Sequence, residues 1–437
     1  MILQNICRVF LNSSRRKVTG QDVCHQNQVA DVYDVVAVDV AHDRGSSRKD
    51  RSRQFADFRA ARIFQGDSEF ASGNCAILIV DRVLNGNAVS ASPHRQPDGA
   101  FEIIELPGGN GDGEHFFPPA DFVRHLGSAK TMETCCTHNM LKLTRRLFAL
   151  APSAAYADYY ERALYNSILA SQDPDSGMMT YFQPTRPGYL KLYCTPTDSF
   201  WCCTGSGMEN HAKYGDSIYF RGTDSLYVNL FIPSTVTWKE KGLTVTQTTR
   251  FPEQDKTRLR LAVQKPMRLS LNIRHPFWCQ IATVFINGYR HTTSREPGRY
   301  IAISRVWRAG DTVEMHLPMT LRTEHLPGQP DVVAFMYGPL VLAGRLGREG
   351  IAPGADIIVN ERTTGNVLKA DVKVPMLVGE LGQIASHISP TTGAALRFQT
   401  EGIGHPHDVN LIPYYRITHE RYNLYWKVVK REDSEKI

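Results

Sequence analysis

Cysteine side chains gather in one part of this 437-residue chain. Five of the nine cysteines lie between residues 135 and 203, as the adjacent pairs Cys135–Cys136 and Cys202–Cys203 and as the single Cys194. An odd total excludes a framework in which every cysteine is paired within the chain, and adjacent cysteines seldom bond each other without backbone strain. The pattern therefore indicates a metal site or a reactive thiolate.

A carboxylate near the first cysteine pair completes a plausible ligand set. Glu133, Cys135, Cys202 and Cys203 together offer one carboxylate and three thiolates, which tetrahedral zinc accepts. Sulfur ligands select zinc over magnesium or calcium. The two halves lie far apart in sequence, so the residues alone also allow buried unreactive cysteines or a disulfide. Cys136 should point away from its neighbour and is left out of the set.

Three further side chains are candidates for chemistry. The glycine-rich stretch 108–115 reads as a flexible loop that ends in Glu114 and His115. Taken alone, Glu114 reads more readily as an ordinary loop carboxylate, and His115 is better suited to orienting a group or facing solvent than to catalysis. Tyr181, taken alone, reads as a core residue.

Helical and strand patterns divide the chain. A helix is predicted from Met132 to Pro152, and Ser153 is the predicted cap of a second helix that ends at Asp173–Pro174. Beyond about residue 222 the period of apolar residues changes from 3.6 to 2, and Asn287–Gly288 is a hairpin signal. The predicted apolar face of the first helix consists of Met140, Leu143, Leu147 and Leu150. A helical part followed by two β-sandwich domains is expected, with a boundary at 327–330.

Composition excludes several classes of protein. Hydrophobic residues make up 42% and charged residues 22%, which is typical of a globular chain of more than one domain. The net charge of +6 is small for this length, and no basic run with interleaved aromatics predicts nucleic-acid binding. No apolar run predicts a membrane span. The mildly apolar start is interrupted by Arg8 and does not read as a secretory signal, so a cytoplasmic location is expected as written, with a periplasmic or secreted location for an intact form. A homo-oligomer is left open.

Several ordered motifs resemble glycoside hydrolase family 127 and the related family 146, the β-L-arabinofuranosidases. The resemblance covers about residues 107–437. Its stretches are Gly-Gly-Asn-Gly-Asp-Gly-Glu-His-Phe (108–116), Glu-Thr-Cys-Cys (133–136), Tyr-Ala-Asp-Tyr-Tyr-Glu-Arg-Ala-Leu-Tyr-Asn (156–166), Trp-Cys-Cys (201–203), Leu-Tyr-Val-Asn-Leu-Phe-Ile-Pro-Ser (226–234), Tyr-Gly-Pro-Leu-Val-Leu-Ala-Gly (337–344) and His-Glu-Arg-Tyr-Asn-Leu-Tyr-Trp (419–426).

The resemblance implies roles for these residues. Glu114 stands at the position of the family's general acid/base, and Cys202 at that of a cysteine nucleophile. Zn²⁺ is the implied cofactor, bound by Glu133, Cys135, Cys202 and Cys203, while Tyr181 and His115 fall in the sugar site. The implied reaction is a retaining double displacement on arabinofuranosides, in which a thiolate replaces the second carboxylate.

The resemblance also implies a multidomain α + β architecture, with an (α/α)6 barrel of the six-hairpin glycosidase type. Twelve helices need well over about 250 residues, whereas about 115 are present between 107 and 222. The expected division is an atypical, unassigned segment 1–106, a partial barrel 107–222, and β-sandwich domains 223–325 and 326–437. We hypothesise that 1–106 is an out-of-frame start. An inactive truncated member, or an exo-glycosidase for another sugar, are the alternatives.

Overall fold

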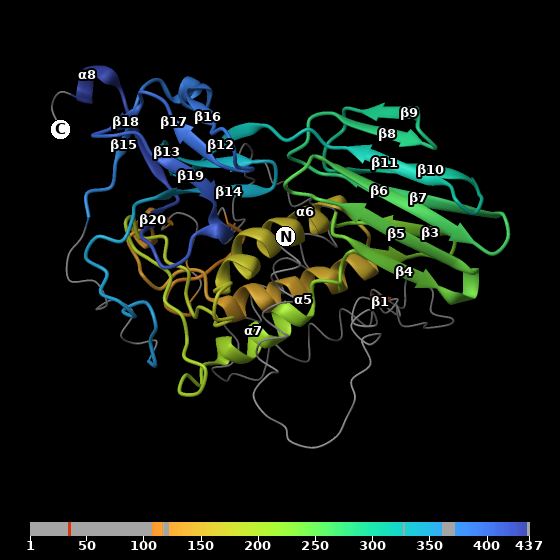
Figure 1. The fold of residues 1–437 in the computed structure, drawn as a ribbon, viewed down its shortest axis with the longest axis horizontal. Coiled ribbons are helices and arrows are strands. Elements are labelled where there is room, and N and C mark those ends of the chain that lie inside the picture. The colour runs from red at the N-terminus through yellow and green to blue at the C-terminus, as the bar shows by residue number, and fades with distance from the viewer. Residues whose placement is uncertain are drawn as a thin grey trace.

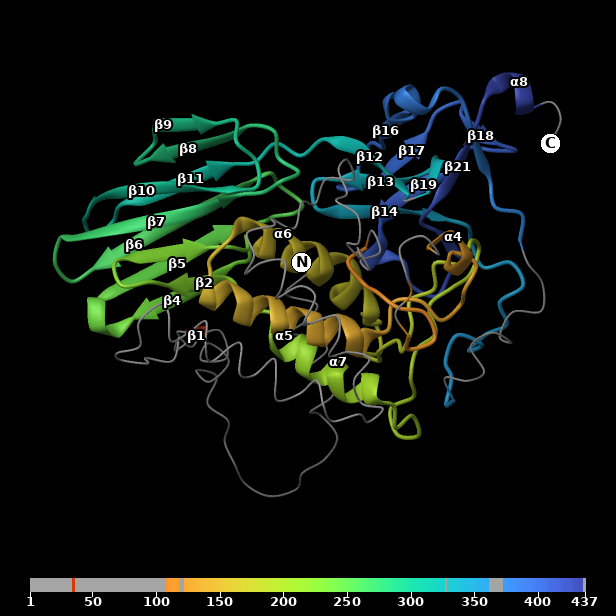
Figure 2. The same ribbon diagram turned by 180° about the vertical axis from the view of Figure 1, so that it is seen from behind.

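The computed structural model describes residues 107–115, 117, 122–326, 328–360 and 372–434, together with the two-residue strand β1 (Asp34–Val35). The predictions for the rest of segment 1–106 therefore lie outside the described residues. Helices α5 and α6 lie between one group of strands in green and another in blue, in both views (Figures 1 and 2). A helical part followed by β-sheet regions is thus confirmed. None of the described helices is long and apolar enough to cross a membrane.

The helical part is built mainly from three helices. They are α5 (Thr134–Leu150), α6 (Ala154–Ala163) and α7 (Cys202–Ala212), accompanied by the short α4 (Phe122–His125), the π-helix η3 (Leu164–Ile168) and the 3₁₀ turn η4 (Leu169–Ser171). The predicted cap is confirmed, because the Ser153 side chain accepts a hydrogen bond from the Ala155 amide at the start of α6.

The buried face of α5 differs in part from the predicted one. Met140 and Leu147 are buried as expected, but Leu143 is only half-buried and Leu150 is 55% exposed. Leu141 and Phe148 are buried instead. The face is thus rotated by about one residue, because the helix packs against α6 on one side and α7 on another, which a single apolar stripe does not encode.

Two sheets follow the helices and share one apolar core. The four-stranded sheet has the order β10 (Arg299–Trp307), β7 (Met267–His275), β3 (Ser225–Val228) and β2 (Tyr219–Arg221). The seven-stranded sheet has the order β1, β4 (Ser234–Trp238), β5 (Leu243–Thr249), β6 (Lys256–Val263), β11 (Thr312–His316), β8 (Ala282–Ile286) and β9 (Tyr289–Ser294). The predicted hairpin is confirmed: Asn287 and Gly288 both have positive φ, as a type I′ turn between β8 and β9 requires.

A ten-stranded sheet forms the C-terminal part. Its order is β16 (Ile388–Pro390), β17 (Phe398–Thr400), β19 (Asn410–Pro413), β14 (Leu340–Arg345), β13 (Gln329–Tyr337), β21 (Trp426–Val429), β15 (Met376–Val378) and β18 (Gly404–His405), with β12 (Leu321–Leu326) beside β13 and β20 (Tyr422–Asn423) beside β14. The remaining short helices are η5 (Lys239–Lys241), η7 (Leu381–His387), η8 (Tyr414–Arg416) and α8 (Arg431–Ser434). The predicted boundary at 327–330 falls inside the β12–β13 hairpin, so β12 belongs to this sheet.

A buried ionic cluster joins α6 to the four-stranded sheet. Arg274 of β7 lies 2.5 Å from both Asp158 and Glu161 of α6, and it donates to the Asn229 carbonyl at 2.6 Å. Trp278 donates to the second oxygen of Glu161 at 2.8 Å. Burial raises the pKa of Asp158 to about 6 even beside the arginine. The cluster therefore holds α6 on the sheet only while the Arg274 guanidinium balances the two carboxylates.

We expect Arg274→Met to destabilise the protein by about 3–5 kcal/mol, because two buried carboxylates lose the guanidinium with which both are paired. Urea unfolding measures this loss. The matched control is Arg299→Met, whose partner Glu296 lies 3.7 Å away on the surface and which should leave the free energy of unfolding nearly unchanged. Equal effects of the two substitutions would contradict the prediction.

Candidate active site

Glu114 stands in a closed turn, and not in the flexible loop that the glycines predicted. The amide of Asp112 donates to the carbonyl of His115 at 2.9 Å, and the amide of His115 donates back at 3.1 Å. Gly113 and Glu114 between them both have positive φ, of 57° and 71°. The turn is tied to the following segment, because the Gly113 amide donates to the Lys130 carbonyl at 2.9 Å. Glu114 is thereby held exposed at the tip.

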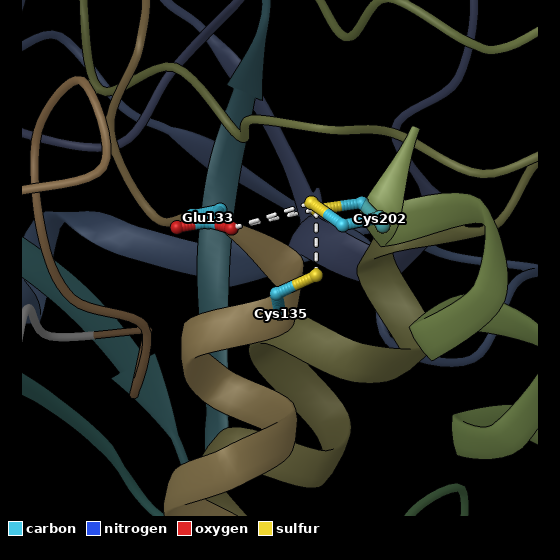
Figure 3. A group of neighbouring side chains, drawn as sticks. Glu133, Cys135 and Cys202 are labelled. Carbon is cyan, nitrogen blue, oxygen red and sulfur yellow. Dashed lines mark hydrogen bonds between the residues drawn. The ribbon is translucent and has the colours of Figure 1, made fainter. Parts of the chain in front are cut away.

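The predicted metal ligands converge at the start of two helices. Glu133 is the N-cap residue of α5 and Cys135 lies in its first turn, while Cys202 and Cys203 are the first two residues of α7. Figure 3 shows Glu133 and Cys135 facing Cys202 across the gap between these helix ends. One ligand atom from each of the four residues lies within 4.8 Å of all the others. Both helix dipoles direct their positive ends here, which favours thiolates.

The spacing within this cluster fits a tetrahedral cation. The Sγ atoms of Cys202 and Cys203 are 3.9 Å apart, and both lie within 3.9 Å of the Glu133 carboxylate. Zinc–sulfur bonds of about 2.3 Å in a tetrahedron place two sulfurs about 3.8 Å apart. Cys135 approaches Cys203 to 3.3 Å and is held from its other side by the Ser206 hydroxyl at 3.0 Å. The donor set and its spacing therefore suit zinc.

The negative charge that these four groups can carry would also be stabilised by a cation. Burial, followed by the nearby charges of Cys202 and Glu114, raises the pKa of Glu133 to about 7. Burial raises the pKa of the Cys203 thiol well above its ordinary value. Hydrogen bonds with the Cys135 and Cys203 thiols lower the pKa of Cys202 instead. Without a cation the four groups thus concentrate negative charge on one exposed sulfur, that of Cys202.

Tyr181 connects the turn to the cluster. Its buried ring leaves the hydroxyl free to donate to the Glu114 carboxylate, and the Sγ of Cys202 lies 3.4 Å from the same hydroxyl. Its carbonyl accepts the Thr134 amide at the start of α5 at 3.0 Å, and Trp201 packs edge-on at 5.7 Å. One side chain therefore bridges the predicted acid/base and the predicted nucleophile. His115 is placed differently: it is exposed beside Glu114, and no hydrogen bond recorded for the described residues includes its ring.

Several residues of the site were missed by sequence reasoning. Asp112 accepts from the Ser128 hydroxyl at 2.5 Å and lies 2.6 Å from the His125 ring. Ser206 was also missed, although its place four residues after Cys202 puts it on the same face of α7. A helical reading of 202–212 could have found Ser206, whereas the turn that positions Asp112 has no spacing signal.

A second group of acidic and histidine side chains lies elsewhere. His419 is 3.2 Å from Asp173 and 2.5 Å from Asp356, and Asp175 lies close by. Asp173 already accepts from the Asp175 and Ser176 amides. Because its acceptors are satisfied by the protein, this group is a structural link between the loop after η4, the 349–359 segment and the C-terminal sheet.

This link should depend on pH. Although burial opposes the charged form, the hydrogen bond to Asp356 and the charges of Asp173 and Asp356 raise the pKa of His419 above its ordinary value of 6.5. Its contribution to stability is therefore present below pH 6.5 and lost as pH rises through the raised pKa. We expect the difference in melting temperature between wild type and His419→Asn to shrink as the pH rises above 6.5 and through the raised pKa of His419. Asparagine tolerates the positive φ of this position, so a constant difference would contradict the prediction.

Comparisons with known proteins identify the domains of this chain. A profile described as the GH127 catalytic domain of β-L-arabinofuranosidase matches residues 104–216, and one for the GH127 middle domain matches residues 225–319. A third profile, for a domain of unknown function, matches residues 322–428. All four residues of the cluster and Glu114 fall inside the catalytic profile.

One curated relative and two solved structures show the same likeness. The non-reducing end β-L-arabinofuranosidase of Bifidobacterium longum subsp. longum is 26% identical over 316 residues, which are 65% of this chain and 46% of that protein. A GH127 β-L-arabinofuranosidase structure from Geobacillus stearothermophilus T6 has a TM-score of 0.58 at 20% identity, covering 82% of this chain and 59% of its own. A GH127 β-arabinofuranosidase structure has a TM-score of 0.57 at 19% identity, covering 81% and 58%.

This chain spans about half the length of the curated relative and under two thirds of the two solved structures. The structural likeness, at this identity, establishes the fold. The sequence profiles carry the family, since two consecutive domains of one family match in order over most of the described chain. As the motifs had indicated, the chain belongs to glycoside hydrolase family 127.

Proposed function

We propose that this chain is a zinc-dependent, retaining exo-glycosidase that releases β-L-arabinofuranose from arabino-oligosaccharides or glycoconjugates. One observation carries the proposal: Tyr181 joins Glu114 to Cys202, and Cys202 is the exposed member of a cluster that suits zinc. The relatives in the family that are named as β-L-arabinofuranosidases support the choice of sugar.

The first half of the reaction uses the two bridged groups. Glu114 donates its proton to the glycosidic oxygen as the bond from that oxygen to the anomeric carbon breaks. The Cys202 thiolate attacks the same carbon from the opposite face and forms a carbon–sulfur bond. The Tyr181 hydroxyl fixes the direction of the Glu114 carboxylate while lying beside the attacking sulfur.

The second half reverses these roles. Glu114, now ionised, accepts a proton from a water molecule, whose oxygen attacks the anomeric carbon. The carbon–sulfur bond breaks and Cys202 leaves as a thiolate, so two inversions give net retention. Glu133, Cys135, Cys202 and Cys203 would hold the metal, which when bound keeps the thiols deprotonated and neutralises their charge.

The proposal extends to the architecture. We infer that α5, α6 and α7 are part of an (α/α)6 barrel, within a partial catalytic domain. The two β-sandwich domains predicted at 223–325 and 326–437 would then begin at β2 and at β12, because these strands belong to the sheets that follow them. The apolar core that the first two sheets share supports the first of these. The second is supported by the ten-stranded sheet, which has a further core of its own besides the residues that it contributes to the first core.

The test is hydrolysis of p-nitrophenyl β-L-arabinofuranoside beside the α-L anomer and other pentosides. We expect turnover of the β-L-arabinofuranoside alone, with NMR showing that the first arabinose formed keeps the β configuration. Turnover of another pentoside would replace the proposed sugar, and an inverted product would contradict the mechanism. Arabinose binding without turnover of any substrate would instead identify an inactive family member.

A further inference from the structure

We propose that Asp112 is the positioning residue for Glu114. The Asp112 carboxylate fastens the turn on which Glu114 lies both to α4 and to the segment that leads into the metal cluster. This inference rests on the proposed role of Glu114 as the acid/base. It gives a role to a residue of the motif 108–116 that the sequence analysis left without one, and it assigns a purpose to a side-chain network next to the site.

The turn needs an outside restraint. Glu114 has a φ of 71°, a left-handed conformation that costs free energy for any residue with a Cβ. Such a conformation persists only where the surrounding structure holds it. The two backbone hydrogen bonds between Asp112 and His115 close the turn, but they do not fix its direction relative to Cys202.

The Asp112 side chain supplies that direction. One carboxylate oxygen lies 2.6 Å from Nδ1 of His125 in α4, and the other accepts the Ser128 hydroxyl at 2.5 Å. His125 is itself held by stacking on Phe117 at 3.9 Å. Only 19% of the Asp112 side chain is exposed, so both hydrogen bonds are partly shielded from solvent.

The same network reaches the metal cluster. The Ser128 hydroxyl also accepts the Lys130 amide at 3.1 Å, and the Lys130 carbonyl accepts the amide of Gly113. Met132, directly before the ligand Glu133, donates to the Gly111 carbonyl at 3.1 Å. The turn and the first metal ligand are therefore built on one short, internally bonded unit. Asp112 sets the position of Glu114 relative to Cys202 through this unit.

The chemistry predicts a selective defect in Asp112→Ala. Proton donation depends steeply on the position of the acid, and a misplacement of about 1 Å can cost about 100-fold in rate. A substrate with a poor leaving group needs this proton, whereas the dinitrophenolate of a dinitrophenyl arabinofuranoside departs without it. We expect kcat/KM to fall by at least ~30-fold for an arabinose disaccharide and by less than ~3-fold for the dinitrophenyl substrate. A general loss of structure would lower both equally.

The matched control is Asp408→Ala. Asp408 fastens a loop of the C-terminal sheet through the Thr400 hydroxyl and the Gly402 amide, so the same chemical change is made outside the site. Its ratio between the two substrates should stay at the wild-type value. Asp112→Asn, which keeps the shape and one acceptor, should lie between wild type and Asp112→Ala and serves if the alanine variant does not fold.

A second measurement does not require turnover. Hydrogen exchange of the peptide containing Gly113 and His115 should be at least ~10-fold faster in Asp112→Ala than in wild type, because its two bonded amides lose their support. Unchanged exchange, or an unchanged substrate ratio, overturns the proposal. If wild type hydrolyses nothing, the proposed function fails; faster exchange in the variant still supports the fastening of the turn.

Discussion

Replacing Cys202 with serine should lower kcat/KM for a β-L-arabinofuranoside by at least ~10³-fold. A serine hydroxyl stays protonated at neutral pH, whereas the hydrogen bonds of Cys135 and Cys203 lower the pKa of the Cys202 thiol. Cys202 is also the exposed cysteine of the cluster, so its sulfur is the one that a sugar can reach. Steady-state rates with the p-nitrophenyl substrate measure the loss.

Loss of metal must be separated from loss of the nucleophile. Cys135→Ser changes another predicted ligand and therefore tests the loss of metal without loss of the nucleophile. Cys136→Ser changes the neighbouring cysteine outside the cluster and is its control. If Cys202 attacks the sugar, a slow substrate should add one arabinosyl group to the peptide that contains Cys202, and mass spectrometry detects it. Activity retained in Cys202→Ser with full zinc content would exclude the thiolate mechanism.

Local features of the fold were predictable because their causes are local. The change to a period of two beyond about residue 222 predicted strands such as β5, and Asn287–Gly288 predicted the β8–β9 turn, since few other residues accept its dihedral angles. The side chain of Ser153 caps α6 for a similar reason. The buried face of α5 was predicted only in part, because which side of a helix is buried depends on neighbours distant in sequence.

The candidate site required more than residue types. Cys135 and Cys203 are 68 residues apart, and their types alone left a metal site, inert thiols and a disulfide open. The order of motifs across the family favoured the metal site. The pairing of Asp173 with His419 had no such signal, since the two residues are 246 positions apart in sequence. Asp112 lies inside the motif 108–116, but its role was not predicted, because it acts through a turn that the glycines had suggested was flexible.

Purified protein should contain about one zinc per chain, and Cys203→Ala should remove it. Cys203 is the central member of the predicted ligand set: it is fully buried, and its Sγ lies 3.3 Å from Cys135, 3.9 Å from Cys202 and 3.8 Å from Glu133. Its loss leaves three ligands and a cavity where the sulfur was. Zinc affinity measured against a chelator should therefore fall by at least ~100-fold, which is more than the loss of a residue that only hydrogen-bonds to a ligand costs.

The matched control for this change is Cys279→Ala. Cys279 is also fully buried, but it lies after β7 with its thiol donating to the Ile281 carbonyl at 3.3 Å. Both variants lose one buried sulfur, so a common loss of stability would appear in both, whereas loss of zinc should appear only in Cys203→Ala. Because zinc binding stabilises the folded state, added zinc should raise the melting temperature of wild type and of Cys279→Ala alone. A wild-type chain that takes up no zinc would show that its four ligands do not assemble in solution, and the thiolate mechanism would fall with the metal site.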